Sequence, residues 1–256
     1  SGVSLNNFSA AFGVGYNIGA LKIRANISRT GRAPSIEELY SNGPHVATQS
    51  FEVGNADLRS ERSWNGELYA RYDSTRFDFS TTLYANRFSS FIYESATGAI
   101  VDDLPEFVYL QRNARVWGVE AEASAQLAHL SGFDIVLDGV ADYTRASIRD
   151  AGPAPRIPPL RLLGGLELQS SNVELRGEVE WNADQNRFSV SETPTDGFTM
   201  VNASLTWRPF GNDRNISVIA AANNIFDVEA RRAASFTKDF VALAGRDFRL
   251  TARFSF

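Results

Sequence analysis

The side chains in this sequence that could bind a metal ion are few and lie close together in one polar segment. His45 stands seven residues before Glu52, and Asp57 follows five residues later. Imidazole and carboxylate groups are ligands that suit Zn²⁺, and a loop can fold such residues together. His45, Glu52 and Asp57 therefore form a candidate metal site, with the alternative that His45 only packs on a neighbouring surface and bonds there. The other histidine, His129, is expected in an exposed turn.

A second group of candidate binding residues is basic. Arg231, Arg232 and Lys238 lie in the long polar stretch that precedes the last strand-like segment. They could meet an anionic ligand or the phosphates of surface lipid. The alternative is an ordinary solvated loop.

Carboxylates and arginines also recur at alternate positions along several strand-like segments. The acidic members are Glu120, Glu122, Glu167, Glu174, Glu178 and Glu180, and the basic members are Arg24, Arg71, Arg161, Arg176, Arg249 and Arg253. Paired carboxylates can be catalytic, but this regular recurrence indicates cross-strand ion pairs. The sequence also lacks a convincing Ser/His/Asp spacing or a phosphate-binding glycine loop, so we expect no enzyme.

The elements that must position these residues are strands, because apolar and polar residues alternate almost everywhere. "LKIRANIS" places Leu21, Ile23, Ala25 and Ile27 on one face and polar residues on the other. About eleven such segments occur, most of them longer than usual strands. They lie near 5–16, 19–28, 61–73, 76–88, 112–127, 133–147, 159–170, 173–184, 197–208, 215–224 and 244–256.

The connections between these strands alternate between short and long, which is the layout of an outer-membrane β-barrel. "YDST" and "SSN" are short, whereas "ESATGAIVDDLPEF" and "FDVEARRAASFTKDFVALA" are expected as long loops. In the first long loop, Ser35 and Glu38 fit a capping box and predict one helical turn. A soluble β-sandwich is the alternative, but its core would have to bury the carboxylates of the polar faces.

Aromatic residues concentrate near the ends of the strands, as in the belts at bilayer interfaces. The expected girdle residues are Trp64, Tyr72, Phe77, Trp181, Trp207, Phe254 and Phe256. A carbohydrate-binding platform is the alternative interpretation. The terminal Phe256 would lie in the girdle at the periplasmic side.

The composition is consistent with these expectations but does not decide between them. Of the 256 residues, 43% are hydrophobic and 21% are charged, and cysteine is absent, which excludes disulfides. No run of eighteen apolar residues predicts a transmembrane helix, and the first residues do not read as a signal peptide. The net charge of −5 and the absence of a basic stretch argue against nucleic acid as a partner.

Several segments resemble TonB-dependent outer-membrane receptors. The resemblance is carried by "ANISRTGRAPSIEELYSNGPHVATQSFEVGNADLRSERS", "PRIPPLRLLGGLEL", "ETPTDGFTMVNASLTWRP" and "NNIFDVEARRAASFTKD", and it covers nearly the whole chain. The string "GPHVATQSFEVGN" is most similar to the branch that includes zinc-uptake receptors. By this resemblance, the string would be the place where a zinc ligand is contributed.

The resemblance implies a 22-stranded barrel in the Gram-negative outer membrane, filled by an N-terminal plug. Residues 1–256 would be the C-terminal half of that barrel, without the plug and the N-terminal strands. The implied partners are outer-membrane lipid, the missing plug and barrel half, the energising TonB–ExbB–ExbD complex and, through the last strand, the barrel-assembly machinery.

The function implied is energised uptake of a scarce nutrient, first zinc and then a ferric siderophore. The metal or chelate would be the transported substrate, and no resident cofactor is expected. A passive porin-like or adhesin barrel formed by self-association is the alternative, and an outer-membrane lipase is a further one.

Overall fold

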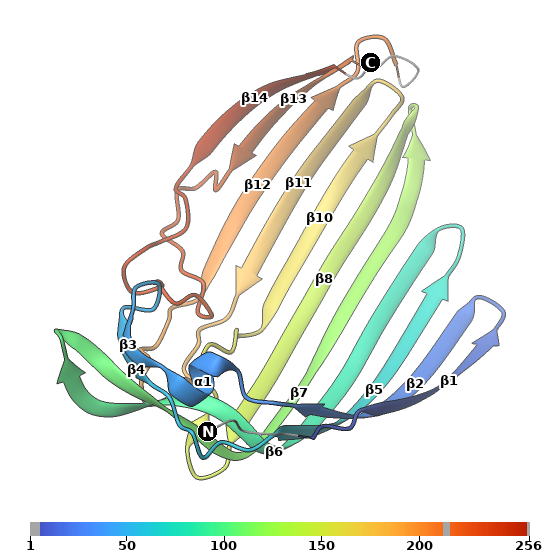
Figure 1. Ribbon diagram of the computed structural model, residues 1–256. Coiled ribbons are helices and arrows are strands. Elements are labelled where there is room, and N and C mark those ends of the chain that lie inside the picture. The colour runs from blue at the N-terminus through green and yellow to red at the C-terminus, as the bar shows by residue number, and fades with distance from the viewer. Residues whose placement is uncertain (1–5, 212–215, 255–256) are drawn as a thin grey trace.

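A computed structural model of the protein describes residues 6–211 and 216–254, which form one large, curved β-sheet (Figure 1). Eleven strands follow one another along the sheet, and every neighbouring pair among them is antiparallel. They are β1 (Ala10–Ile18), β2 (Leu21–Arg32), β5 (Glu61–Asp73), β6 (Phe77–Val101), β7 (Leu104–Leu130), β8 (Phe133–Ile148), β10 (Arg161–Gln169), β11 (Val173–Asn182), β12 (Phe198–Trp207), β13 (Ile216–Asn223) and β14 (Asp247–Phe254).

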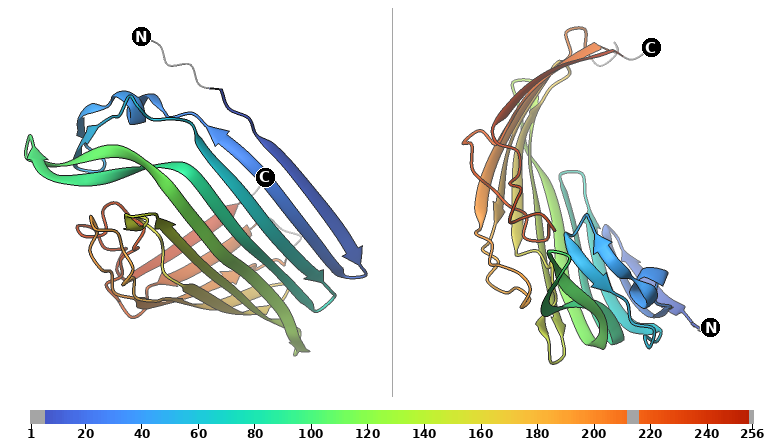
Figure 2. Two further views of the ribbon diagram at one scale, coloured as in Figure 1. Left: turned by 90° about the horizontal axis from the view of Figure 1, so that it is seen from below. Right: turned by 60° about the vertical axis from the view of Figure 1, so that its left-hand side comes forward.

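The prediction of an all-β antiparallel sheet with about eleven long strands is confirmed. Three further short strands lie at one end of the sheet: β3 (Asn42–His45), β4 (Ser50–Val53) and β9 (Gly152–Pro153). Within the described residues, β1 pairs only with β2 and β14 only with β13, so the sheet is open. Figure 2 shows it bending like part of a barrel wall.

The two rims of the sheet differ in the length of their connections. Short turns join β1 to β2, β5 to β6, β7 to β8 and β10 to β11, and they lie toward the upper right of Figure 1. The opposite rim carries the long connections, from 33 to 60, from 149 to 160, from 183 to 197 and from 224 to 246. Both β1 and β14 run toward the short-turn rim, as the odd number of strands requires.

One expected loop is in fact a strand hairpin. The segment "ESATGAIVDDLPEF" continues β6 and β7 outward from the sheet, and the two strands meet at a tight turn between Val101 and Leu104. Asp102 and Asp103 in this turn have φ angles of 51° and 62°. Successive positive φ values are typical of the two-residue hairpin turns that match strand twist. The expectation of a loop was wrong because Asp102 and Asp103 form a two-residue hairpin turn between the extended strands.

The helical turn predicted in the first long connection is confirmed as α1 (Ile36–Tyr40). The Ser35 hydroxyl accepts a hydrogen bond from the Glu38 backbone N–H at 3.2 Å, and the Ser35 N–H donates to Glu38 Oε2 at 2.7 Å. Glu38 also bonds Arg32 at the end of β2. The capping box thus fixes how the chain leaves the sheet.

The two faces of the sheet have different chemistry. The outer face exposes large apolar side chains, such as Leu68 at 45% and Leu83 at 47%. The inner face carries cross-strand ion pairs: Arg176 Nη2 lies 2.9 Å from Asp138 Oδ2, and Arg161 Nη1 lies 3.1 Å from Asp142 Oδ2. An apolar outside and a charged inside are the arrangement expected of a barrel that faces lipid and encloses a polar lumen.

Buried apolar residues form two small clusters near the long-loop rim rather than one central core. One consists of Ala114, Ala146, Ile148 and Ala154, and the other of Leu39, Leu58 and Ile92. They hold the extended β6–β7 hairpin against the connections beside it. In the described part of the chain, no helix has the length and apolar character needed to cross a membrane.

Candidate functional site

The structure brings His45 and Glu52 together at the long-loop rim. They lie on the small hairpin of β3 and β4, in which His45 pairs with Ser50. The Nδ1 atom of His45 lies 2.7 Å from the Thr48 hydroxyl and 3.4 Å from Glu52 Oε1. The His45 side chain is 54% exposed, whereas that of Glu52 is 8% exposed. One ring nitrogen therefore faces polar groups of the hairpin while the imidazole remains accessible.

Tyr109 connects this hairpin to the extended β6–β7 hairpin. Its hydroxyl lies 2.9 Å from Glu52 Oε2 and 3.1 Å from Glu94 Oε1, and it shares its one proton between the two carboxylates. Tyr109 lies beyond Ala114, where the pairing of β7 with β8 ends, so it is outside the barrel wall. Burial, followed by the hydrogen bond to Glu52, raises the pKa of the Tyr109 phenol. The phenol therefore keeps its proton and holds the two carboxylates in place.

The structure does not bring Asp57 to this pair. Asp57 is exposed and follows Asn55, whose side-chain oxygen accepts the Asp57 backbone N–H at 3.0 Å. Among the described residues, no group of three His, Cys, Asp or Glu side chains is arranged to hold a metal ion. His129 lies at the opposite, short-turn rim, 2.8 Å from Asp134. Of the two histidines, both of which lie in the described residues, His45 is therefore the one at the long-loop rim.

The basic residues Arg231, Arg232 and Lys238 are engaged in contacts of the long connection from 224 to 246. Arg232 Nη2 donates to Glu180 Oε2 at 2.9 Å, and its guanidinium lies 5.2 Å from the centre of the Phe198 ring. Arg231 donates to the Lys238 carbonyl and to Glu229. These contacts anchor the connection on β11 and β12, and we did not anticipate them from the sequence.

Lys238 is almost completely buried, at 5% exposure, so it is not a solvated loop residue. Its ammonium donates to the Thr193 carbonyl at 3.0 Å and to Asp239 Oδ1 at 2.9 Å. The hydrogen bond from Lys238 lowers the pKa of Asp239. Two long connections, 183–197 and 224–246, are therefore joined through one lysine.

A cavity of about 270 Å³ lies between these connections and the inner wall. Its polar lining residues include Arg161, Asn182, Thr195, Asp196, Arg231 and Arg232. The Thr195 hydroxyl is buried and has no hydrogen-bond partner in the part of the chain that the structure describes. The alternation of apolar and polar residues within the strands predicted that Arg161 faces the lumen, but no sequence signal pointed to Thr195.

The expected girdle residues fall into two groups by height. Trp64 and Trp181 lie toward the long-loop rim, with exposures of 55% and 40%. Tyr72, Phe77, Trp207 and Phe254 lie at the short-turn rim, where the Tyr72 and Phe77 rings are 6.1 Å apart. Phe256 lies outside the described residues. These positions fit two interfacial belts, and a role in the membrane stays a prediction for each residue.

Comparison with known proteins finds a matching family model and a relative of similar sequence. A family model described as "TonB dependent receptor-like, beta-barrel" matches residues 1–225. The heme/hemopexin utilization protein C of Haemophilus influenzae (strain 86-028NP) is 25% identical over 264 residues, which cover 92% of this chain and 35% of that protein.

Solved structures share the fold at low sequence identity. The copper transporter OprC superimposes with a TM-score of 0.82 at 20% identity, covering 97% of this chain and 39% of the transporter. The siderophore receptor PirA from Pseudomonas aeruginosa gives a TM-score of 0.65 at 18% identity, covering 97% of this chain and 42% of the receptor. The chain thus spans well under half the length of these relatives.

Proposed function

The chain belongs to the TonB-dependent receptor β-barrel family of the Gram-negative outer membrane, whose members are transporters and not enzymes, and we propose that residues 1–256 supply about half of the barrel of a nutrient-uptake receptor. The observation that carries this proposal is the direction of the edge strands. Both β1 and β14 run toward the short-turn rim, so they cannot pair with each other in an antiparallel barrel. Further strands are needed for closure, and a barrel of 22 strands would use eleven more.

The proposal implies a partner for each surface of the sheet. A plug domain would occupy the lumen and contact the charged inner face, where Arg176 and Arg161 lie. Outer-membrane lipid would cover the apolar outer face. Energy would come from the TonB–ExbB–ExbD complex through the plug, and the last strand would engage the barrel-assembly machinery.

For the substrate, we propose a metal ion or metal chelate, with zinc ranked before a ferric siderophore. The names of the relatives include copper, a siderophore and heme, so they do not decide among these substrates. The basic residues that could receive an anionic chelate, Arg231, Arg232 and Lys238, are already engaged in the long connections. His45, in contrast, is an exposed metal-ligand type.

The geometry around His45 fits a histidine ligand with supporting groups behind it. Nδ1 is occupied by Thr48 and Glu52, and Nε2 has no partner among the residues that the structure describes. Metal-binding histidines commonly donate one ring N–H to a carboxylate or other acceptor, which fixes the ring for coordination through the other nitrogen. In this proposal Nε2 of His45 binds zinc, and Glu52 orients the ring from the Nδ1 side. Zinc prefers four ligands, so the remaining ligands would come from the rest of the receptor or from water, because Asp57 does not lie beside His45 among the described residues.

Replacement of His45 is expected to weaken zinc binding by the native outer-membrane protein that carries this chain. For His45→Ala, we expect a loss of at least 10- to 100-fold in zinc affinity, because even changes in supporting residues of a zinc site cost that much. Binding of Zn²⁺ to the purified protein and zinc accumulation by cells are the measurements. His129→Ala, at the opposite rim, is the matched control and should leave both unchanged. Wild-type zinc affinity in His45→Ala, with a loss of ferric-siderophore uptake instead, would contradict zinc as the substrate.

A further inference from the structure

The outer face of the sheet changes from apolar to basic within a few residues. One row across β5, β6, β7 and β8 is apolar or aromatic and consists of Leu68, Leu83, Val119 and Tyr143. Two rows nearer the long-loop rim, the corresponding outward residues are Trp64, Arg87, Arg115 and Ser147. Because side chains alternate between the faces of a sheet, both rows point to the same side. The basic residues are therefore a continuation of the surface that faces lipid.

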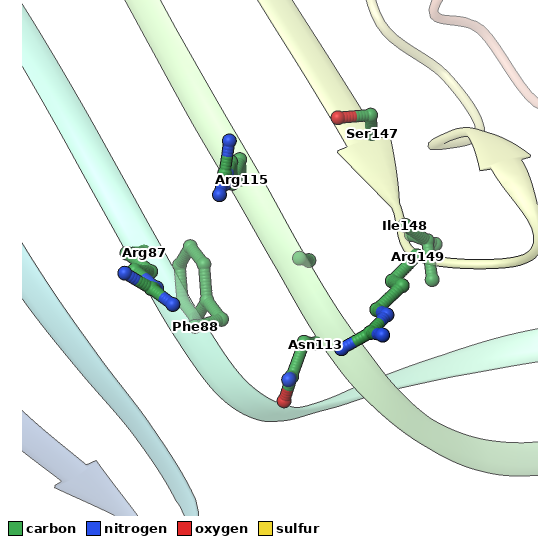
Figure 3. A pocket seen from close by; sticks show the side chains of 8 residues that line it. Arg87, Phe88, Asn113, Arg115, Ser147, Ile148 and Arg149 are labelled. Carbon is green, nitrogen blue, oxygen red and sulfur yellow. The ribbon is translucent and has the colours of Figure 1, made fainter.

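A cavity of about 310 Å³ lies at this place. Its polar lining residues are Arg87, Asn113, Arg115, Ser147 and Arg149. Phe88, Ala114 and Ile148, at the intervening positions of the same strands, line it as well. Figure 3 shows Arg87, Arg115 and Arg149 coming from three neighbouring strands or strand ends. The residues lie far apart in the sequence, and only the register of the sheet brings them together.

Two of the three arginines of this cavity have no acidic partner among the described residues. Neither the Arg87 nor the Arg115 guanidinium makes an ion pair or hydrogen bond with any described residue. Arg149 lies 3.7 Å from Asp150, whose side chain is 71% exposed. Arginines of the inner face differ, since Arg176 is bonded to two carboxylates. The outer cavity thus has guanidinium groups available for an external anion.

The position of the cavity relative to the aromatic residues of the outer face indicates which anion would reach it. Trp64 pairs directly with Arg87, and Trp117 lies one row closer to the apolar surface. Trp117 is 45% exposed and packs edge-on against Tyr143 at 5.6 Å between ring centres. Tryptophan and tyrosine rings prefer the headgroup level of a bilayer. Arg87 and Arg115, just beyond these rings on the same face, would lie level with lipid phosphates.

We propose that the cavity between Arg87, Arg115 and Arg149 binds a phosphate group of a phosphorylated glycolipid of the outer leaflet. The planar guanidinium group presents paired N–H donors that match phosphate oxygens. Asn113 and Ser147 add neutral hydrogen-bonding groups at the edges. The bound lipid would fix the base of the extended β6–β7 hairpin. That hairpin carries Tyr109, which contacts Glu52 at the long-loop rim. This inference concerns the outer wall and does not depend on the identity of the substrate.

The test compares lipid retention by the native outer-membrane protein and its variants in nanodiscs. The probe is diphosphoryl lipid A, and lipid A lacking both phosphates is the reference lipid. Native mass spectrometry counts the bound lipid. For Arg87→Ala/Arg115→Ala, we expect retention of the diphosphoryl form to fall by roughly fivefold per arginine, with no change for the reference lipid. Arg76→Ala, in the exposed turn between β5 and β6, is the control and should retain the lipid.

A lysine variant separates a folding defect from lost recognition. Arg87→Lys/Arg115→Lys keeps both charges but loses the paired donors, so we expect a folded barrel with intermediate retention. Undiminished retention of diphosphoryl lipid A by the alanine variant would overturn the proposal. Displacement of the lipid by inorganic phosphate at equal concentration would also overturn it, because the site would then belong to a free anion.

Discussion

Replacement of Glu180 by alanine is expected to release the connection from 224 to 246 from the inner wall. Glu180 is 6% exposed and accepts hydrogen bonds from Arg161 at 3.1 Å, Asn182 at 2.8 Å and Arg232 at 2.9 Å. Its removal leaves two guanidinium groups without their shared carboxylate. Breaking a fully buried ion pair costs about 3–5 kcal/mol. Because the Arg161 and Arg232 side chains are 32% and 40% exposed, we expect about 2–3 kcal/mol here.

The measurement for Glu180→Ala is hydrogen exchange and limited proteolysis of residues 224–246 in the native protein. Both should increase strongly in that segment, while the strands β5 to β8 keep their protection. Glu229→Ala is a suitable control, since Glu229 pairs with Arg231 of the same connection but its side chain is 72% exposed. Equal protection of the segment in Glu180→Ala and the wild type would contradict the assignment of Glu180 as its anchor.

Replacement of Gly118 by valine is expected to disrupt the inner wall, because Tyr84 lies directly over this glycine. The Tyr84 hydroxyl and the Thr144 hydroxyl are 2.6 Å apart, so the tyrosine of β6 reaches β8 across β7. A Cβ atom at Gly118 would collide with the Tyr84 ring and lie 2.6 Å from the Tyr143 carbonyl oxygen. Overpacking costs about 1–3 kcal/mol, and loss of the hydrogen bond adds about 1 kcal/mol.

The free energy of unfolding in detergent micelles tests this expectation. Gly118→Val should lower it by about 2–4 kcal/mol, and Gly118→Ala should lower it by less. Gly66→Ala is the matched control on β5, because a Cβ there meets no atom within 4 Å. Addition of Tyr84→Ala to Gly118→Val should recover part of the loss. If the double variant is as unstable as the sum of the single ones, the steric account is wrong.

The sequence was sufficient to predict the strands of the sheet, because the alternation of polar and apolar residues along a strand is a local property. The segment from 61 to 73 was predicted with the bounds that β5 has, Glu61–Asp73, since its polar and apolar residues alternate throughout. The capping box at Ser35 is also local and was predicted correctly. The outer half of β6 was missed because Gly98 and the Asp102–Asp103 pair resemble a loop, although they form a bulge and a tight turn.

The candidate sites depend on contacts between distant residues, which the sequence pattern does not encode. His45 and Glu52 lie on one small hairpin, so their proximity was predictable. Their connection to Glu94 runs through Tyr109, 57 residues from Glu52. Arg232 reaches Glu180 across 52 residues because the last long connection folds back over the wall. The basic outer cavity likewise depends on the register that places Arg87 beside Arg115.

The central claim is that this chain forms part of the wall of a larger, plugged receptor, and the mass of the native polypeptide tests it most directly. The protein would be extracted from outer membranes and its intact mass measured. A mass of more than about twice the 28.2 kDa of this chain is expected, since a barrel of 22 strands with a plug requires it. A native mass of 28.2 kDa would contradict the account. These strands would then close with copies of themselves, as in a passive porin or adhesin.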